Sequence, residues 1–361
     1  MRKEWRVKDC HQEYRVTLAD EDPRCFVRDF CERWEGSKVV LLSQTLVLQQ
    51  CGLPLIQMLE EKGKRVFTYE LPEGEDAKSL QTVEAVWRFL IAHEVDRSTP
   101  LLAIGGGSVT DAAGFIAATY HRGLPLVSVP TTLLGQIDSS IGSKTGINFD
   151  QTKNNIGSFY SPESVYANVR FLNSLTPRHW SCGMAEMIKA GVIDDAELFS
   201  QLEQSDLPKL AKRSDELMEL MARAIAVKIK LVGLDPWDRK KIRTKLNFGH
   251  TIGHAIESTG GFSQYTHGEA VALGMVWESK LAVLFGECRE TEVARLEQLL
   301  LRYELPVSGS FQDAWLPYLM RDKKRVEKDL TFVFLRHIGQ TIVKSVPMAG
   351  WFDKLQCIPN C

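Results

Sequence analysis

The chain has 361 residues, of which 44% are hydrophobic and 25% are charged, a composition that excludes a disordered or fibrous protein and suffices for two domains. The formal net charge of −2 provides no basic excess, which argues against a nucleic-acid partner and favours small-molecule chemistry. The N-terminal segment has no apolar signal core and no stretch reaches the roughly eighteen apolar residues of a membrane span, so we expect a soluble, cytoplasmic protein. The eight cysteines form no CxxC pair, which predicts reduced thiols.

Short β-branched runs alternate with helical patterns in the first half of the chain. Residues 38–42, 65–69, 101–104 and 126–129 are predicted strands of a parallel sheet, and residues 80–93 form one of the helices between them. This alternation predicts a doubly wound, Rossmann-like α/β domain, which we assign to residues 1–177. Such domains bind ligands at the carboxyl ends of their strands.

A glycine turn follows directly on the strand at 101–104. It reads Gly105-Gly106-Gly107-Ser108-Val-Thr110-Asp111 and opens into a helix of small residues. Glycines at such a turn let backbone amides approach a pyrophosphate at a helix N-terminus, which favours a nucleotide site. Thr110 stands where a GxGxxG pattern has its last glycine, so a tight turn without a ligand is the alternative. Asp111 would then only complement the helix dipole.

The most polar segment of the chain lies at residues 130–155. Its donors and acceptors include Thr131, Thr132, Asp138, Lys144, Lys153 and Asn154. Such a segment suits a phosphorylated polyol, because every hydroxyl and phosphate oxygen must regain the hydrogen bonds it had with water. A solvated surface loop is the alternative, but apolar stretches at 124–129 and 156–160 flank the segment and favour a cleft.

The pattern becomes helical from about residue 178. Residues 217–232 carry apolar side chains at helical spacing, and the first strand expected after this point is at 331–335. We therefore predict an all-α second domain over residues 178–361.

Three of the eight histidines fall within residues 250–267. His250 and His254 stand at i and i+4 and share one face of a helix, and a turn at Gly260-Gly261 can return His267 toward them. Imidazole suits Zn²⁺ or Co²⁺, so the window favours a metal site whose ligand pair, on spacing alone, is His250 and His254. Hydrogen-bonded structural histidines are the alternative.

Six motifs in this order resemble the dehydroquinate synthase family. They are Gly-Gly-Gly-Ser-Val-Thr-Asp-Ala-Ala-Gly-Phe from 105, Val-Pro-Thr-Thr-Leu-Leu from 129, Asp-Ser-Ser-Ile-Gly-Ser-Lys-Thr-Gly from 138, Lys-Asn-Asn-Ile-Gly from 153, Ala-Glu-Met-Ile-Lys from 185, and Asn-Phe-Gly-His-Thr-Ile-Gly-His from 247. The resemblance runs from about residue 71 to residue 339. It implies an NAD-dependent and Zn²⁺- or Co²⁺-dependent lyase of the shikimate pathway, which converts 3-deoxy-D-arabino-heptulosonate 7-phosphate to 3-dehydroquinate and phosphate. It also implies a homodimer.

The resemblance changes the expected ligand set. Carried over residue by residue, the family's metal ligands fall on Glu186, His250 and His267. His254 becomes a substrate-side group, either an acid–base group or a hydrogen-bond donor to the phosphate. Two imidazoles and one carboxylate leave a Zn²⁺ site with a net positive charge and an open position, able to polarise a substrate hydroxyl.

The resemblance also implies roles for the remaining polar residues. Asp138 and Lys189 would hold the reacting hydroxyl beside the nicotinamide, with Lys144 and His254 as further catalytic groups. The implied phosphate contacts are Arg122, Lys144, Asn154 and one lysine of 323–324, taken as Lys323; the implied carboxylate contacts are Lys228, Arg243 and Asn247. The implied nucleotide contacts are Glu75, Lys78, Gly105, Gly106, Gly107, Ser108, Asp111, Thr131, Thr132, Asp138, Lys144 and Lys153.

The chain departs from the family pattern at four places. The usual Gly-Gly-Lys is Gly142-Ser143-Lys144, an Asn-His pair is Asn148-Phe149, the Asp-Glu-x-Glu stretch reads Asp235-Pro-Trp-Asp238 with one residue added before Arg243, and Ser43-Gln44 replaces a ribose-binding acid or amide. Valiolone- or inosose-forming sugar phosphate cyclases are therefore alternatives, although His254 and Asn247 favour the carboxylated heptulosonate. A metal-dependent polyol dehydrogenase and a nucleotide-binding regulatory module with a structural zinc are further alternatives.

Overall fold

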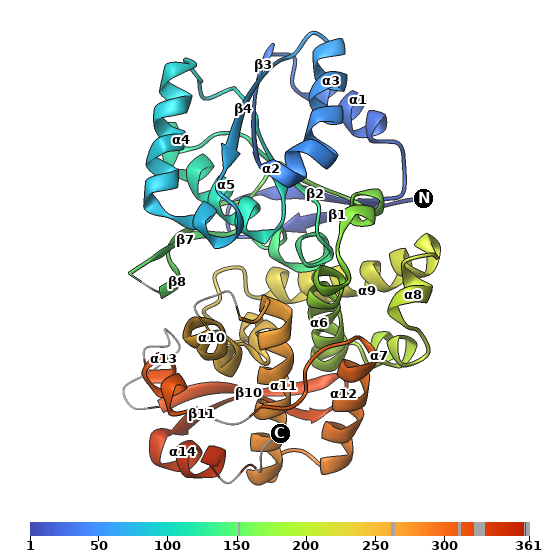
Figure 1. Cartoon of the computed structure of the whole chain (residues 1–361), viewed down its shortest axis with the longest axis vertical. Helices are drawn as coiled ribbons and strands as arrows, with labels where there is room; N and C mark the ends of the chain where they lie inside the picture. The colour runs from blue at the N-terminus through green and yellow to red at the C-terminus, as the bar shows by residue number, and fades with distance from the viewer. Residues whose placement is uncertain (151, 261–263, 310–311, 321–328, 357, 359–361) are drawn as a thin grey trace. The chain divides into compact units, whose positions relative to one another are not determined.

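The structure is a computed structural model that describes residues 1–361 except 151, 261–263, 310–311, 321–328, 357 and 359–361 (Figure 1). The chain divides into two compact units, Met1–Leu175 and Thr176–Cys361. No helix among the described residues is long and apolar enough to cross a membrane.

A seven-stranded sheet forms the centre of the first unit. Its order is β1-β2-β9-β6-β5-β3-β4, antiparallel between β1 and β2 and parallel elsewhere. The strands are β1 (Arg2–Lys8), β2 (Glu13–Ala19), β3 (Lys38–Gln44), β4 (Arg65–Leu71), β5 (Leu101–Gly105), β6 (Leu126–Pro130) and β9 (Ser164–Asn168). A separate hairpin joins β7 (Lys144–Phe149) to β8 (Thr152–Phe159). The predicted α/β fold with a parallel sheet is confirmed, and all four predicted strands are present.

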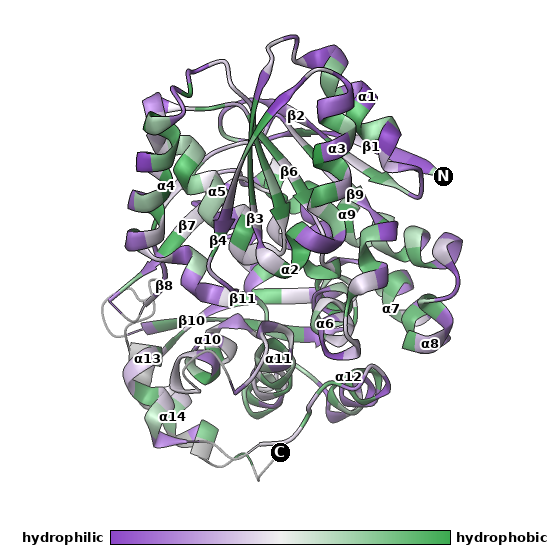
Figure 2. Cartoon of the chain, turned by 45° about the horizontal axis from the view of Figure 1, so that its top comes forward, coloured by the Kyte–Doolittle hydropathy of each residue, from purple (hydrophilic) through white to green (hydrophobic). Residues whose placement is uncertain are grey.

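Helices cover both faces of this sheet, because side chains on successive strand residues point to opposite faces. Val40 and Leu42 of β3 belong to a core shared with α4 (Leu80–Ala92) and α5 (Gly107–Thr119). Val39 and Leu41 belong to the core shared with α1 (Pro23–Arg33) and α3 (Leu53–Glu61). Figure 2 shows the hydrophobic residues concentrated along β3 and β6 and on the helix sides that face them.

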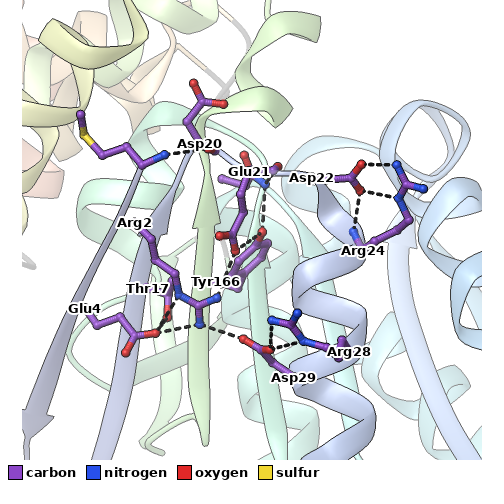
Figure 3. A network of polar contacts seen from close by, with 12 residues as sticks. Arg2, Glu4, Thr17, Asp20, Glu21, Asp22, Arg24, Arg28, Asp29 and Tyr166 are labelled. Carbon is purple, nitrogen blue, oxygen red and sulfur yellow. Dashed lines mark hydrogen bonds and ion pairs between the residues drawn. The ribbon is translucent and has the colours of Figure 1, made fainter.

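Strand β1 at the sheet edge is anchored by ion pairs rather than by burial. Arg2 contacts Glu4 at 2.7 Å, Glu21 at 3.2 Å and Asp29 of α1 at 2.8 Å (Figure 3). The Tyr166 hydroxyl on β9 donates to Glu21 at 3.2 Å. This network ties the β1–β2 hairpin, which the sequence pattern did not predict, to the rest of the unit.

The second unit is built mainly from helices. They are α6 (Pro177–Asp194), α7 (Ala196–Glu203), α8 (Leu207–Leu210), α9 (Ser214–Leu234), α10 (His250–Thr259), α11 (His267–Leu284), α12 (Glu290–Arg302), α13 (Leu316–Met320) and α14 (Met348–Gln356). The all-α expectation needs one correction, because β10 (Asp329–His337) pairs with β11 (Gln340–Pro347) in an antiparallel hairpin. The predicted strand at 331–335 lies within β10, where phenylalanine and valine side chains are buried on both faces.

Helices α10 and α11 pack closely through glycines. A Cβ on Gly274 of α11 would lie only 1.9 Å from the carbonyl oxygen of Gly249, the residue before α10. Gly249 itself has a φ of +78°. Glu278, a fully buried residue of α11, accepts hydrogen bonds from the N–H groups of Gly249 and Thr251 at 3.1 Å each. These contacts fix the start of the helix that carries His250.

Candidate active site

Glu186, His250 and His267 form a ligand triad in the second unit. Glu186 lies on α6 and is 2% exposed, whereas His250 and His267 are the first residues of α10 and α11. One ligand atom from each residue lies within 4.8 Å of the others. Nε2 of His267 is 3.1 Å from Oε1 of Glu186, and Nε2 of His250 is 3.6 Å from the same oxygen.

Both imidazoles of the ligand triad are oriented through their other nitrogen. Nδ1 of His250 lies 3.1 Å from the carbonyl oxygen of Phe248, and Nδ1 of His267 lies 3.4 Å from both oxygens of Glu257. A ring held through Nδ1 offers Nε2 to a cation, as in zinc sites where an outer carboxylate or carbonyl fixes the histidine. Two imidazole nitrogens and a carboxylate oxygen also match the donor preferences of Zn²⁺ and Co²⁺.

The electrostatics of the ligand triad favour a positive charge. Burial lowers the pKa of His250 well below its ordinary value, so this ring is neutral and available as a ligand. Burial also lowers the pKa of His267, but the carboxylates of Glu257 and Glu186 outweigh it and raise the pKa to about 10. The residues present therefore fit a divalent cation.

His254 lies beside the ligand triad on α10. Its ring centroid is 5.3 Å from that of His250 and 6.5 Å from that of His267, and its nitrogens are outside the group of convergent ligand atoms. Lys189, one turn after Glu186 on α6, contacts the Glu186 carboxylate with its ammonium group, and its side chain is 3% exposed. The structure thus brings five sequence-predicted residues together. They are Glu186 and Lys189 of α6, His250 and His254 of α10, and His267 of α11.

The residues implied as contacts of a substrate carboxylate also belong to the second unit, on two elements that follow each other in the chain. Lys228 is on α9, while Arg243 and Asn247 begin and end the 3₁₀ turn η6 (Arg243–Asn247). Arg243 is buried, and its guanidinium donates to the carbonyl oxygen of Pro236 at 2.9 Å. Lys323 lies outside the described residues.

Asp235 shapes the approach to η6, a role that the sequence pattern did not suggest. Its carboxylate is 1% exposed and accepts backbone N–H bonds from four later residues, namely Arg239 at 2.9 Å, Lys240 at 3.0 Å, Ile242 at 3.2 Å and Arg243 at 3.3 Å. Burial would raise the pKa of this carboxyl, but the four N–H donors hold it below its ordinary value. No feature of the sequence distinguishes Asp235 from an exposed aspartate, because its burial and its four N–H donors are set by the fold of the loop.

The glycine turn of the first unit connects β5 to α5. A Cβ on Gly105 would lie 2.5 Å from Val109, and the N–H of Thr131 after β6 donates to the Gly105 carbonyl at 2.9 Å. Gly106, Gly107, Ser108 and Asp111 therefore lie on the turn and first turns of α5, with Thr131 and Thr132 alongside. A helix N-terminus at the carboxyl end of a central parallel strand is suited to a nucleotide pyrophosphate.

Further predicted nucleotide contacts gather around the 3₁₀ turn η2 (Gly74–Lys78). The Lys78 ammonium donates to the Asp111 carboxylate at 2.6 Å and also contacts the side-chain oxygen of Asn154. Lys153 lies 3.6 Å from Glu75. Burial raises the pKa of Asp111, while the Lys78 ammonium opposes the shift.

Two residues that the sequence marked only as part of departures from the family pattern hold this group together. The Asn148 side chain donates to Glu75 at 2.7 Å and accepts from the Asn154 N–H at 3.0 Å, which ties the β7–β8 hairpin to η2. Gln44 donates to the carbonyl oxygens of Pro72 and Gly74 at 2.8 and 3.2 Å. Its neighbour Ser43 is fully buried and donates to the Ile104 carbonyl, so the Ser43-Gln44 pair supports the fold of this region.

Three predicted residues of the first unit lie on separate segments. Asp138 is on the π-helical turn η4 (Gly135–Ser139), and Lys144 is the exposed first residue of β7. Both Ser139 and Lys144 line a pocket that also includes Thr110, Asp111 and Tyr160. Arg122 is exposed and has a φ of +63°.

Comparison with known proteins extends these observations. Residues 68–182 match the model of the 3-dehydroquinate synthase N-terminal domain, and residues 183–325 match the model of the C-terminal domain. The chain is 42% identical over 309 residues to the 3-dehydroquinate synthase of Dehalococcoides mccartyi strain 195, covering 85% of each chain. It is 41% identical over 315 residues to that of Geobacter metallireducens, covering 86% of this chain and 87% of the relative.

Solved structures of related enzymes share the fold. A 2-deoxy-scyllo-inosose synthase complexed with carbaglucose-6-phosphate, NAD⁺ and Co²⁺ has a TM-score of 0.87 at 26% identity. A 2-epi-5-epi-valiolone synthase from Streptomyces hygroscopicus with NAD⁺ and Zn²⁺ bound has a TM-score of 0.86 at 27% identity. Each match covers 98% of this chain and 99% of the solved chain. A glycerol dehydrogenase from Schizosaccharomyces pombe, 17% identical with a TM-score of 0.62, shares the fold alone.

Proposed function

The chain belongs to the 3-dehydroquinate synthase family, and from this membership we propose how its residues carry out the family's reaction. The enzyme is a carbon–oxygen lyase that converts 3-deoxy-D-arabino-heptulosonate 7-phosphate to 3-dehydroquinate and phosphate, with NAD and one divalent metal ion as cofactors. The observation that carries this conclusion is the 42% identity to a 3-dehydroquinate synthase over 85% of both chains.

The second unit holds the metal and one end of the substrate. Glu186, His250 and His267 would ligate Zn²⁺ or Co²⁺, which when bound supplies positive charge that orients and polarises substrate hydroxyls. Lys189 lies against Glu186 and would hold the reacting hydroxyl, a role that we also assign to Asp138. Lys228, Arg243 and Asn247 would bind the substrate carboxylate, for which the planar guanidinium of Arg243 is well suited. His254 would move a proton at one of its ring nitrogens.

The first unit holds the nucleotide and the phosphate. The turn at 105–111, together with Glu75, Lys78, Thr131, Thr132 and Lys153, would bind NAD, which when bound removes hydride from a substrate carbinol and later returns it. Of this unit, Lys144, Asn154 and Arg122 would bind the substrate phosphate and stabilise it as it leaves. Lys323, which belongs to the second unit, is a further proposed phosphate contact. The ketone formed by oxidation acidifies the neighbouring C–H. The substrate's own phosphate accepts that proton and departs by β-elimination. After re-reduction the pyranose ring opens to an enolate and a ketone, and intramolecular aldol addition between them closes the carbocycle without net redox change.

We further propose that the chain acts as a homodimer in the cytoplasm. The support for both is the family resemblance, and sedimentation equilibrium of the full chain tests the dimer.

The function is tested with purified protein, catalytic NAD⁺ and Zn²⁺ or Co²⁺. We expect phosphate release and a cyclic product from the heptulosonate phosphate, in large excess over the NAD⁺ present. Sedoheptulose 7-phosphate and glucose 6-phosphate serve as comparison substrates, since the two solved synthases above produce 2-epi-5-epi-valiolone and 2-deoxy-scyllo-inosose. Preference for either comparison substrate, or NAD⁺ consumption equal to product formed, would contradict the proposal.

A further inference from the structure

The residue directly before Lys144 has a backbone conformation that its side chain disfavours. Ser143 has a φ of +64°, in the left-handed region that residues other than glycine rarely occupy. It is 5% exposed, whereas Lys144 is exposed at the start of β7. Such a conformation persists where the surrounding structure holds it in place.

The Asp9 carboxylate holds Ser143. Asp9 is 9% exposed, lies between β1 and β2, and accepts a hydrogen bond from the Ser143 hydroxyl. It also accepts from the Ser161 hydroxyl at 2.6 Å and from the His11 N–H at 3.1 Å. A buried carboxylate with several donors is a strong and directional anchor, because charged acceptors form stronger hydrogen bonds than neutral ones.

The backbone on both sides of the Ser143 side chain is held as well. The Gly142 N–H donates to the Tyr14 hydroxyl of β2 at 3.0 Å. The Tyr160 N–H donates to the Ser143 carbonyl oxygen at 2.7 Å. The β1–β2 hairpin, far from Lys144 in sequence, therefore supports the turn that leads into β7.

We propose that Asp9 is a positioning residue for Lys144. Its carboxylate keeps Ser143 in the left-handed conformation and so fixes the backbone from which the Lys144 side chain extends. Glycine occupies this region at no steric cost, so the anchor is required because residue 143 is serine. The inference rests on the proposed function, in which Lys144 binds the substrate phosphate.

Four forms of the full-length holoenzyme test whether Asp9 acts through Ser143: wild type, D9A, S143G and D9A/S143G. We expect D9A to lower kcat/KM for the heptulosonate phosphate by roughly tenfold or more, mainly through KM, because a displaced binding group loses its geometry. The kcat/KM of S143G should remain within about twofold of the wild-type value. Adding D9A to S143G should lower kcat/KM by no more than about threefold. Metal affinity should be unchanged in all four.

S161A is the comparison variant. It removes one hydroxyl from the Asp9 carboxylate, together with the 3.3 Å contact between that hydroxyl and the Ser143 hydroxyl, but it leaves the Asp9–Ser143 hydrogen bond in place. It should lower Tm while leaving KM unchanged. The proposal is overturned if D9A is equally harmful with and without S143G, or if S161A reproduces the KM change.

Hydrogen exchange provides a readout that does not depend on turnover. The amides at 142–144 should exchange faster in D9A than in wild type, and D9A should add little in the S143G background. If D9A accelerates exchange at 142–144 equally with and without S143G, the proposal that Asp9 holds Ser143 is overturned. This readout is independent of activity. Absence of phosphate release by the wild type would contradict the proposed function and not this proposal.

Discussion

The two imidazoles of the ligand triad are held by partners of different strength. His250 is oriented by a backbone carbonyl, whereas His267 is oriented by the buried carboxylate of Glu257. A carboxylate on Nδ1 makes the opposite nitrogen a better electron donor and keeps the ring in one tautomer. Glu257 was not among the residues suggested by the sequence, because it lies on α10 whereas His267 begins α11, and the sequence does not show how two helices pack.

Glu257→Ala should weaken metal binding by roughly tenfold to a hundredfold, because it removes the carboxylate that orients His267. Competition with a chromophoric chelator measures the Kd for Zn²⁺. Ser258→Ala is the neighbouring control on α10 and should leave the Kd within about threefold of wild type. An unchanged Kd in the glutamate variant would show that the 3.4 Å contacts have no role in metal binding.

His250→Ala and His254→Ala should separate ligation from proton transfer. The first should lose bound metal and activity together, because Nε2 of His250 faces Glu186. The second should retain metal and lower kcat by roughly a hundredfold, as expected for an acid–base group. Metal analysis of dialysed protein alongside turnover gives both values, and equal loss of metal in the two variants would refute the ligand assignment.

The histidine window illustrates how far the sequence alone reaches. Helical spacing places His250 and His254 on one face, and α10 indeed begins at His250. Spacing cannot bring in Glu186 from another helix, because helix packing, here through Gly249 and Gly274, decides which residues converge. The family resemblance supplied that residue.

The loop from Asp235 to η6 is held by one carboxylate. Four N–H donors converge on Asp235, and the last of them belongs to Arg243, a proposed carboxylate-binding residue. The stretch contains one residue more than the family pattern, and Lys241 within it has a φ of +61°. The Asp235 carboxylate therefore stabilises a loop that is one residue longer than the family pattern.

Asp235→Asn should destabilise the protein at neutral pH by about 1–3 kcal/mol, because a weaker acceptor replaces the carboxylate. The folded-state pKa of Asp235 is depressed, so its stabilisation is fully present above the unfolded value of about 4 and is lost as pH falls through the lower folded value. Urea unfolding across this pH range should show the gap between variant and wild type closing below about pH 4. Asp238→Asn is the control in the same loop, and a gap that stays constant with pH would contradict the account.

The elements predicted correctly and those missed differ in burial. Strands β3, β5 and β6 are buried on both faces and appear in the sequence as continuous apolar runs. Strand β1 alternates charged residues with only one fully buried position, so its pattern is close to that of a surface loop. The β7–β8 hairpin also has few buried positions, so its polar sequence gives no clear strand pattern either. Asp9 and Asn148 lie next to or on these missed elements, so their roles were hidden as well.

In the proposed mechanism each compact unit carries one part of the chemistry. The first contains the glycine turn and the polar residues around η2, and the second contains the ligand triad. The sequence pattern changes from strand–helix alternation to helices near residue 178, and the α/β class of the first unit follows directly from that alternation. The β10–β11 hairpin was under-predicted, because a single late strand gave no indication of its partner.

The central claim is that oxidation is transient and that the same hydride returns to the product. Heptulosonate phosphate deuterated at the carbinol carbon that is oxidised tests this claim when turned over with unlabelled, catalytic NAD⁺. Mass spectrometry of the products should find the deuterium retained in 3-dehydroquinate, with free NADH neither labelled nor accumulating. Deuterium in free NADH, or its loss to solvent, would contradict the account.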